Sequence, residues 1–240
     1  MRKVFLFAIA CALLPLASCG PRWDTGNITT EQKTVTDFTS IDISAPVDAV
    51  VTVKPGATPS VTLKGFPDVL KRIKTEVVDG RLRIYTDEKR WNLNFDENAK
   101  AAITVSSLSQ LDLAGAADVD VIGNITGDMF SLNVAGAGDV KIDELNTDKL
   151  SVDAAGAADV SIKKGVVRSA EYDFSGAGDL KAYGLQSNDV RASVSGAGDV
   201  KLSVSQTLDA SISGVGSIQY KGNPAVSKSV SGIGSVSQAN

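Results

Sequence analysis

The stretch AGAGDVKI, residues 135–142, decides the fold, because close relatives of its first six residues recur along the chain. Two glycines and two alanines bury little apolar surface, so a single copy contributes little to a hydrophobic core. Each copy places Asp or Ser before an aliphatic residue. The seven copies are AGAADV (114–119), AGAGDV (135–140), AGAADV (155–160), SGAGDL (175–180), SGAGDV (195–200), SGVGSI (213–218) and SGIGSV (231–236).

The spacing of these motifs predicts a solenoid. Their first glycines are separated by 21, 20, 20, 20, 18 and 18 residues, and a period near twenty is typical of one coil per repeat. Aliphatic residues alternate with polar ones on both sides of each motif, as in strands with one buried face. We therefore predict an all-β fold, a right-handed parallel β-helix with rungs of about 20 residues. A left-handed β-helix is the alternative, favoured by the last two spacings. The structural turn glycines are Gly115, Gly136, Gly156, Gly176, Gly196, Gly214 and Gly232.

The small residues of the motif are expected to form a tight corner. Rungs stacked about 4.8 Å apart repeat one backbone conformation, and a Cβ at a positive φ would cost about 1 kcal/mol per rung. The middle alanine is expected to point inward, where larger side chains would clash. Val215 and Ile233 replace it in the last two copies, which predicts a wider or self-covering end.

Residues 33–110 carry no motif but are predicted to be the β-rich N-terminal part of the domain, and residues 111–240 the β-helix repeats. Residues 75–78 and 81–85 flank Asp79-Gly80 and predict a hairpin. Residues 66–73 are consistent with one helical turn. The pattern leaves open whether this part forms irregular early rungs or a small β cap on the solenoid.

The N-terminus has the order of a bacterial lipoprotein signal. Arg2 and Lys3 precede an apolar run too short to span a bilayer, so residues 1–18 are predicted to be a signal peptide. Leu16-Ala17-Ser18-Cys19 resembles a lipobox, which predicts lipidation at Cys19 and anchoring in the membrane. Gly20 stands where inner-membrane retention signals have Asp, which favours the outer membrane. Either side of that membrane is compatible with the signal. Residues 19–32 are expected to be the lipidated cysteine and a polar tether.

Composition excludes several classes of function. The sequence contains no histidine, which rules out Ser-His-Asp and Cys-His relays and His-ligated metal sites. Its net charge is −4, and −6 once Arg2 and Lys3 leave with the signal peptide. Such a chain has no electrostatic reason to bind nucleic acid.

An acidic column is the first candidate site. The structural interpretation is that each carboxylate accepts a hydrogen bond within its own turn, with Lys141, Lys181 and Lys201 neutralising part of the column. The alternative is a row of calcium ions, which would need oxygen ligands from a second column (Asp112, Asn133, Asp153 and Asp173). The column consists of Asp118, Asp139, Asp159, Asp179 and Asp199.

Arg90 and Trp91 are the second candidate site, since an Arg-Trp pair could contact a sugar or lipid headgroups. The structural interpretation is that this segment forms a solvated face with the Trp91 ring half buried. Enzymes built on β-helices use a local, irregular cluster of catalytic groups, whereas the acidic residues here belong to repeating columns or loops. The sequence therefore predicts no catalytic residues and no enzyme.

The lipobox, the segment GRLRIY (residues 80–85) and the serial glycine turns together resemble the bacterial head GIN domain family of auto-transporter adhesins. The turns match in role, since Ala-Gly-Asp or Ala-Ala-Asp stands where the family has Gly-Ile-Asn. The resemblance implies a right-handed β-helix without catalytic residues and a role in adhesion. We expect a non-catalytic cell-envelope lipoprotein for adhesin-like binding or display, with a surface glycan or envelope protein as partner and no cofactor. The alternatives are a polysaccharide-active β-helix enzyme and a purely structural periplasmic lipoprotein.

Overall fold

The computed structural model describes residues 27–86 and 99–239, and 74% of the structure is in strands. The N-terminal elements are β1 (Thr29–Lys33), β2 (Ser40–Ile43), β3 (Val47–Val53), β4 (Ser60–Gly65), α1 (Pro67–Leu70), β5 (Ile73–Val78), β6 (Arg81–Thr86), β7 (Ala99–Val105) and β8 (Gln110–Leu113). They are followed by β9 (Val119–Val134), β10 (Ala137–Ala154), β11 (Ala157–Phe174), β12 (Leu180–Val194), β13 (Ala197–Ile212), β14 (Val215–Lys221), β15 (Ala225–Val230) and β16 (Ile233–Gln238).

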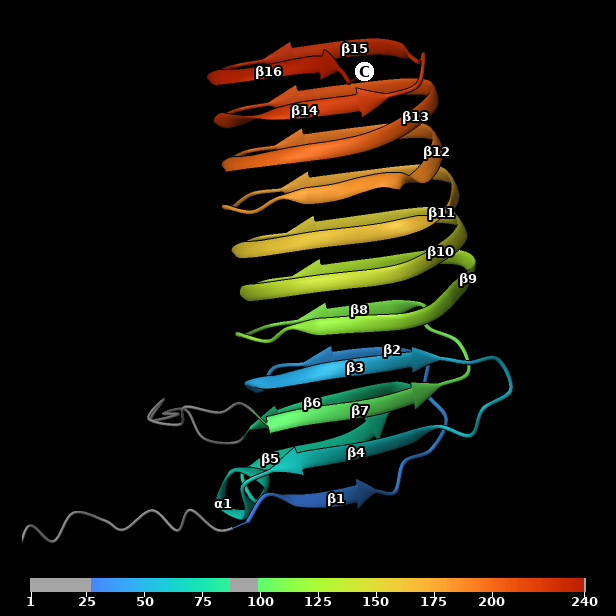
Figure 1. Ribbon diagram of the computed structural model, residues 1–240, viewed down its shortest axis with the longest axis vertical. Coiled ribbons are helices and arrows are strands. Elements are labelled where there is room, and N and C mark those ends of the chain that lie inside the picture. The colour runs from blue at the N-terminus through green and yellow to red at the C-terminus, as the bar shows by residue number, and fades with distance from the viewer. Residues whose placement is uncertain (1–26, 87–98, 240) are drawn as a thin grey trace, which may run out of the picture.

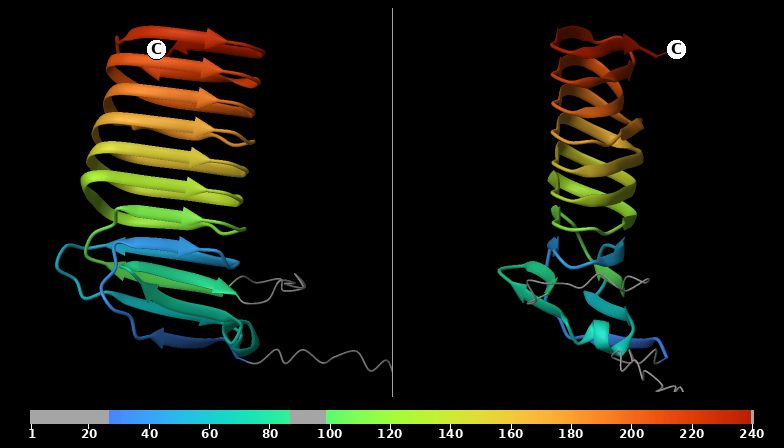
Figure 2. Two further views of the ribbon diagram at one scale, coloured as in Figure 1. Left: turned by 180° about the vertical axis from the view of Figure 1, so that it is seen from behind. Right: turned by 90° about the vertical axis from the view of Figure 1, so that its left-hand side faces the viewer.

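The long strands β9 to β13 stack in parallel and wrap around a flattened solenoid (Figure 1). We call the two sides layer A and layer B. Layer A holds β1, β4, β7, β3, the first halves of β9 to β13, β14 and β16; layer B holds β5, β6, β2, β8, the second halves of β9 to β13 and β15. Figure 2 shows the two layers from behind and from the side. The predicted all-β solenoid with rungs of about 20 residues is confirmed, with about 6 turns. Its right-handed sense stays a prediction.

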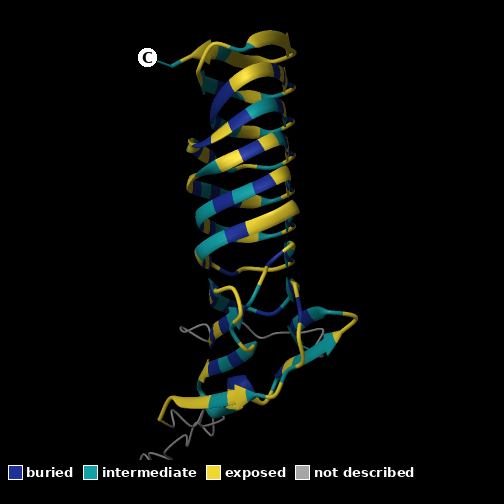
Figure 3. Cartoon of the chain, turned by 90° about the vertical axis from the view of Figure 1, so that its right-hand side faces the viewer, coloured by how far each residue is buried: buried dark blue, intermediate teal, exposed yellow. Residues whose placement is uncertain are grey.

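The core lies between the two layers. Val140 is in register with Val160 of the next rung, Val152 with Tyr172, and all four are buried. Buried and exposed residues alternate along each strand, as the banding in Figure 3 shows. The aliphatic columns flanking the glycine motifs are therefore core columns, as the alternation predicts.

The N-terminal strands are stacked out of chain order. β3 lies between β7 and β9, and β2 lies between β6 and β8, so the first rung of the chain sits against the solenoid and later strands stack beyond it. β4 pairs with β7, and β5 with β6, in antiparallel fashion. The N-terminal part is thus both: parallel rungs continuous with the solenoid, and an antiparallel cap at its end.

The hairpin predicted around Asp79-Gly80 is confirmed as β5 and β6, which pair from Ile73 with Thr86 to Val78 with Arg81. Asp79 has φ 51° and Gly80 φ 73°. Both values are positive, as a two-residue type I′ turn requires. This turn joins two strands of layer B at the N-terminal end.

The N-terminal end of the solenoid is covered. α1 packs beside β4 and buries Val69 and Leu70, and β1 pairs antiparallel with β4. The predicted tether (residues 19–32) is therefore too long at its C-terminal end, because the chain enters the sheet at Thr29. β1 is mostly exposed and polar, so no hydrophobic alternation in the sequence marks it as a strand. No helix in the described part of the chain has the length and hydropathy needed to cross a membrane.

The corner glycines are required for a reason other than the predicted one. Among the seven, only Gly156 and Gly232 have a positive φ. A Cβ built on Gly176 would instead stand 1.9 Å from the carbonyl oxygen of Gly156 in the rung below, and one on Gly196 would stand 1.9 Å from that of Gly176. The expectation of conformational strain was wrong at most corners, because the close approach of stacked backbones excludes a side chain.

The middle alanines point outward, contrary to the prediction. All five are exposed, and two of them, Ala177 and Ala197, face each other in a bridge between rungs. The following residue is the inward one where it has a side chain, since Ala117 and Ala158 are buried. Outward placement explains why Val215 and Ile233 fit at this position, where they are 56% and 78% exposed. The five alanines are Ala116, Ala137, Ala157, Ala177 and Ala197.

The buried Tyr172 is expected to lower the stability of the folded protein at alkaline pH. It is fully buried, and its hydroxyl has no hydrogen-bond partner among the residues described. Burial raises the pKa of this phenol well above its usual range. Above about pH 10 the unfolded chain releases the proton while the folded chain retains it, so stability falls with rising pH by up to about 1.4 kcal/mol per unit.

We expect Tyr172→Phe to lessen this alkaline loss without reducing stability at pH 7, since no hydrogen bond is removed. Urea unfolding at pH 7 and pH 11 measures the difference. Tyr85→Phe is the control, because that ring lies on β6 and is only partly buried. Equal pH profiles for Tyr172→Phe and the unsubstituted protein would contradict the assignment.

Candidate functional site

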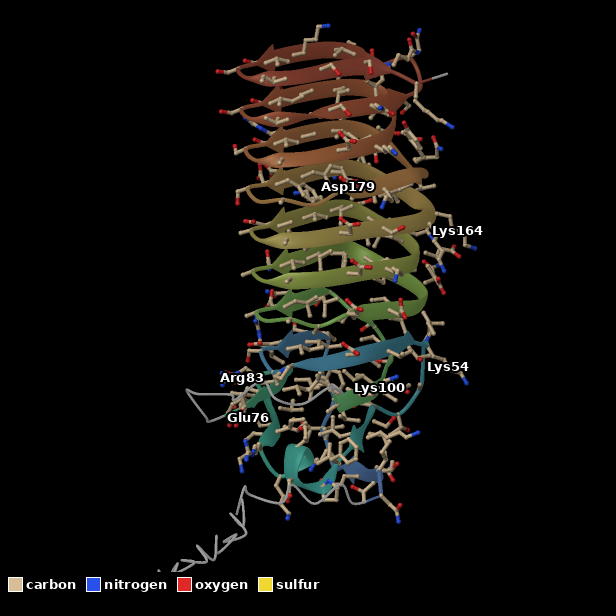
Figure 4. All side chains as sticks on the ribbon, turned by 60° about the vertical axis from the view of Figure 1, so that its left-hand side comes forward. Lys54, Glu76, Arg83, Lys100, Lys164 and Asp179 are labelled. Atoms are coloured by element: carbon tan, nitrogen blue, oxygen red, sulfur yellow. The ribbon has the colours of Figure 1, made fainter. Side chains whose placement is uncertain are left out.

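The predicted acidic column is a single row on layer A. Asp139 is in register with Asp159, and Asp199 with Ser217, so the row runs parallel to the solenoid axis. Asp179, labelled in Figure 4, lies between Asp159 and Asp199. The structure therefore brings together all five predicted aspartates.

Asp48 is a sixth member that the sequence analysis missed. Its carboxylate accepts a hydrogen bond from the amide of Asp118 at 3.2 Å, and their neighbours Ala49 and Val119 are paired. Residues 44–49 contain no glycine motif, so repeat spacing could not reveal it. The available signal was the alternation of buried Val47, Ala49 and Val51 around it.

Four of the five predicted aspartates bind the backbone of the next rung. Asp118 accepts from the amide of Asp139 at 2.9 Å, and Asp159 from that of Asp179 at 2.9 Å. Asp199 accepts from both the amide and the hydroxyl of Ser217, at 3.0 and 2.7 Å. The expectation of bonds within each turn was therefore wrong, because a stacked corner places the next rung's N–H closer to the carboxylate than its own turn.

Lysines neutralise part of the column. Lys141 lies 3.7 Å from Asp139, and Lys181 lies 3.4 Å from Asp159 and 3.9 Å from Asp179. These exposed pairs contribute little to stability individually, about 0 to 1 kcal/mol. Lys201 makes no ion pair within the described residues. The column is thus a structural ladder with partly balanced charge.

We expect Asp199→Ala to lower the free energy of unfolding by about 1 to 3 kcal/mol, because two donors of Ser217 lose their acceptor. Asp199→Asn keeps an acceptor oxygen and is expected to cost less than half as much. Asp173→Ala on layer B is the matched control, since this exposed carboxylate has no hydrogen bond in the part of the chain described. Urea unfolding of the three variants tests the ladder. Equal losses for Asp199→Ala and Asp173→Ala would refute it.

The second polar column does not add ligands to the first. Asp112 lies on β8 in layer B, where its carboxylate contacts Arg81 and accepts from Gln110 and Asn133. The aspartate ladder lies on layer A. Across residues 27–86 and 99–239 no group of three or more acidic or cysteine side chains is placed to hold a metal ion.

Calcium at millimolar concentration is expected to leave the melting temperature unchanged, because each rung supplies one ladder carboxylate while calcium prefers six to eight oxygens. Thermal unfolding in calcium and in a chelator gives the comparison. A concentration-dependent rise of more than about 2 °C in calcium would show binding to the folded state.

A second set of charged groups lies at the broad corner opposite the glycines. Lys163 lies 2.6 Å from Asp143, and Lys164, labelled in Figure 4, lies 2.7 Å from Glu144. Hydrogen bonds from Lys164 and Asn146 lower the pKa of Glu144, and the bond to Asp143 raises the pKa of Lys163. The pairs line a shallow, open depression with their charges matched. The sequence analysis missed them because these charges occur in two rungs only and form no column that recurs along the chain.

Tyr183 marks the change from 20-residue to 18-residue rungs. The register between β12 and β13 shifts between Ala182 and Gln186, so Tyr183 lies in the bulge. Its hydroxyl is 3.2 Å from the side-chain oxygen of Gln219, and the Lys221 ammonium lies 4.8 Å from its ring centre. Partial burial raises the pKa of Tyr183. The cluster joins two rungs that are not adjacent.

Two predicted sites lie outside the described residues: Cys19, and the pair Arg90 and Trp91. The two arginines of β6, which precede Arg90 and Trp91 closely in the sequence, form ion pairs on layer B. Arg81 contacts Asp112, and Arg83 lies 2.9 Å from Glu76 (Figure 4).

The fold and its side-chain ladders define a β-solenoid covered by repeated polar columns. Residues 37–224 match the family model described as "Putative auto-transporter adhesin, head GIN domain". The chain belongs to the head GIN domain family, as the sequence resemblance predicted.

Solved structures share this fold over nearly the whole described chain. A putative adhesin from Bacteroides fragilis is 28% identical with a TM-score of 0.82, covering 88% of this chain and 97% of the other. A putative lipid binding protein from Parabacteroides distasonis is 22% identical with a TM-score of 0.72, covering 90% and 98%. A putative adhesin from Parabacteroides merdae is 22% identical with a TM-score of 0.69, covering 90% and 98%. A search of curated proteins gave no match.

Proposed function

We propose that the protein is a non-catalytic module for adhesin-like binding or display at the bacterial cell envelope, attached to the outer membrane by lipid on Cys19. Membership of the head GIN domain family and the 28% identical adhesin-like relative support a surface role. The lipobox at residues 16–19 supports the anchor.

One structural observation carries the proposal. The aspartate ladder of layer A repeats from rung to rung, and its carboxylates also accept hydrogen bonds from the backbone of the neighbouring rung. Such a surface offers the same weak contact many times, and repetition multiplies weak contacts into useful affinity. The partner class that fits is a repeating surface glycan or an envelope protein, without a cofactor.

Labelling of intact cells tests the surface role. An amine-reactive label that does not cross membranes would reach exposed lysines such as Lys149 and Lys164. We expect the protein to react on intact cells as it does in lysed cells. Protection on intact cells, with full reaction after lysis, would place the solenoid in the periplasm and contradict the adhesin-like role.

The anchor and the absence of catalysis have separate tests. Cys19→Ala is expected to move the protein from the membrane fraction to the soluble fraction, and mass spectrometry of the unsubstituted chain is expected to find acyl chains on Cys19. The purified protein is expected to release neither unsaturated nor reducing sugar from uronate polymers. Release of either would establish a polysaccharide-active enzyme instead.

A further inference from the structure

The last rung of the solenoid, formed by β15 and β16, is open on its far side. Each strand pairs with one neighbour, β15 with β13 and β16 with β14, and none of the described residues covers the other edge (Figure 1). All six residues of β15 are exposed. The inward apolar residues of this rung lie above buried ones: Val226 above Leu208, Val230 above Ile212 and Val236 above Ile218. We call this rung the open rung.

The open rung also presents backbone groups that can pair with another strand. The amide of Ser231 donates to the carbonyl of Ile212 in the rung below at 2.7 Å. Successive peptide groups of a strand point to opposite sides, so those of Val226, Lys228 and Val230 point to the free edge. A hydrocarbon surface would leave these groups without hydrogen bonds, whereas one more strand would satisfy them.

Lys228 sets a condition on such a strand. It is the only charged residue of β15 and β16, it occupies an inward position above the buried Ala210, and it makes no ion pair within the described residues. Residues 213–239 contain Lys221 and Lys228 but no acidic residue. Asp209, the last acidic residue of the sequence, lies on the outward side in register with Ser227. An ammonium group without a counter-charge therefore lies in the middle of an apolar end.

The N-terminal end of the solenoid is closed to such a partner. Its edge strand on layer A, β1, carries Glu31 and Lys33 in register with the buried Leu63 and Val61. These two inward charges neutralise each other at 2.6 Å. On layer B the inward side chains of the edge strand β5 are buried or half-buried. The open rung differs because its inward charge is unmatched and its inward apolar residues are exposed.

We propose that the open rung binds one extended segment of a partner protein, which adds a parallel strand to β15 and places a carboxylate over Lys228. The segment carries apolar side chains two residues before and after its Asp or Glu, because alternate residues of a strand share a face and meet Val226 and Val230. Main-chain hydrogen bonds supply affinity, and the charge pair supplies selectivity. A second copy pairing through the same rung would bring two Lys228 ammonium groups together. The inference depends neither on the lipid anchor nor on a glycan bound to the sides of the solenoid.

A synthetic strand tests the proposal on the full chain. The probe is a fluorescent peptide of residues 224–239 that carries Lys228→Glu, so that it copies the last rung with an acid in place of the lysine. We call it the acidic peptide. Fluorescence polarisation is expected to show saturable binding of the acidic peptide. The unsubstituted peptide is expected to bind at least about tenfold more weakly, because its lysine meets Lys228.

Exchanging the charges shows whether Lys228 makes the contact. The full chain with Lys228→Glu is expected to prefer the unsubstituted peptide over the acidic peptide by at least about tenfold, a gain that also shows the variant to be folded. Lys221→Glu is the matched control, because this exposed lysine of the same end lies over the Tyr183 ring. We expect it to weaken binding of the acidic peptide less than about threefold, as for a charge at the rim of an interface. Equal effects of the two variants would overturn the proposal.

A peptide of identical composition separates strand pairing from simple attraction between charges. Lys228→Ser together with Ser229→Glu moves the carboxylate by one residue, to the outward face of the added strand. This peptide is expected to bind at least about tenfold more weakly than the acidic peptide. Equal binding of the two would overturn the proposal.

Two other occupants of the open rung are distinguished by the full chain without peptide. Self-association of the unsubstituted protein in light scattering, abolished by the acidic peptide, would assign the rung to a second copy. Co-sedimentation with phosphatidylglycerol vesicles that Lys228→Glu abolishes and Lys221→Glu does not would assign it to lipid. Either result would overturn the proposal, and we expect neither.

Discussion

Replacing Gly176 with alanine is expected to lower the free energy of unfolding by at least about 4 kcal/mol, or to prevent folding. The added Cβ would lie 1.9 Å from the carbonyl oxygen and 2.6 Å from the nitrogen of Gly156. Both atoms belong to the backbone of the rung below, so no side-chain rotation can relieve the clash. The two rungs must separate at the corner, which breaks the hydrogen bond from Ala177 to Gly156.

Gly115→Ala is the matched control. A Cβ on Gly115 meets no atom within 4 Å, because this is the first corner of the series. We expect a change of less than about 1 kcal/mol, as for an ordinary exposed substitution. Urea unfolding followed by circular dichroism measures both variants. If Gly176→Ala and Gly115→Ala lose similar stability, backbone proximity is not what requires glycine.

Replacing Lys228 with valine is expected to make the protein self-associate through its C-terminal end. β15 and β16 form the last rung, which Figure 1 shows uncovered at the top. Lys228 occupies an inward position there, in register with the buried Ala210. The positions below it in this column are apolar and buried: Leu111, Leu132, Val152, Tyr172, Ala192 and Ala210.

An inward charge on an open edge discourages pairing with another strand, because pairing would bury the ammonium group. Valine would instead extend the apolar end formed by Val226 and Val230. We expect the unsubstituted protein to be monomeric and Lys228→Val to reach at least twice that mass, measured by light scattering across a concentration series. Lys149→Val, on the outward side of layer B, is expected to remain monomeric. Self-association of the unsubstituted protein would show that Lys228 does not protect the edge.

The corner motif, its spacing and the flanking alternation sufficed to predict the solenoid, its rung length and its core columns. These features recur in every copy of the motif, so each copy indicates the same arrangement of a corner between two half-buried strands. The constant period places these arrangements one above another. The hairpin at Asp79-Gly80 was predictable for a related reason, because a turn of two residues with positive φ depends on those residues alone. The aspartate column also follows from the period, which aligns residues 20 apart.

The sequence by itself therefore determined the repeating half of the protein and its family. Only the tertiary structure decided which strands become neighbours in the N-terminal part, where β3 lies between β7 and β9 and brings Asp48 under the ladder. A period-two pattern states which face of a strand is buried but not which strand lies beside it. The role of the corner glycines, the amide partners of the aspartates and the inward position of Lys228 were hidden for the same reason: each depends on backbone atoms of another rung, whose distance is set by packing between segments far apart in the chain.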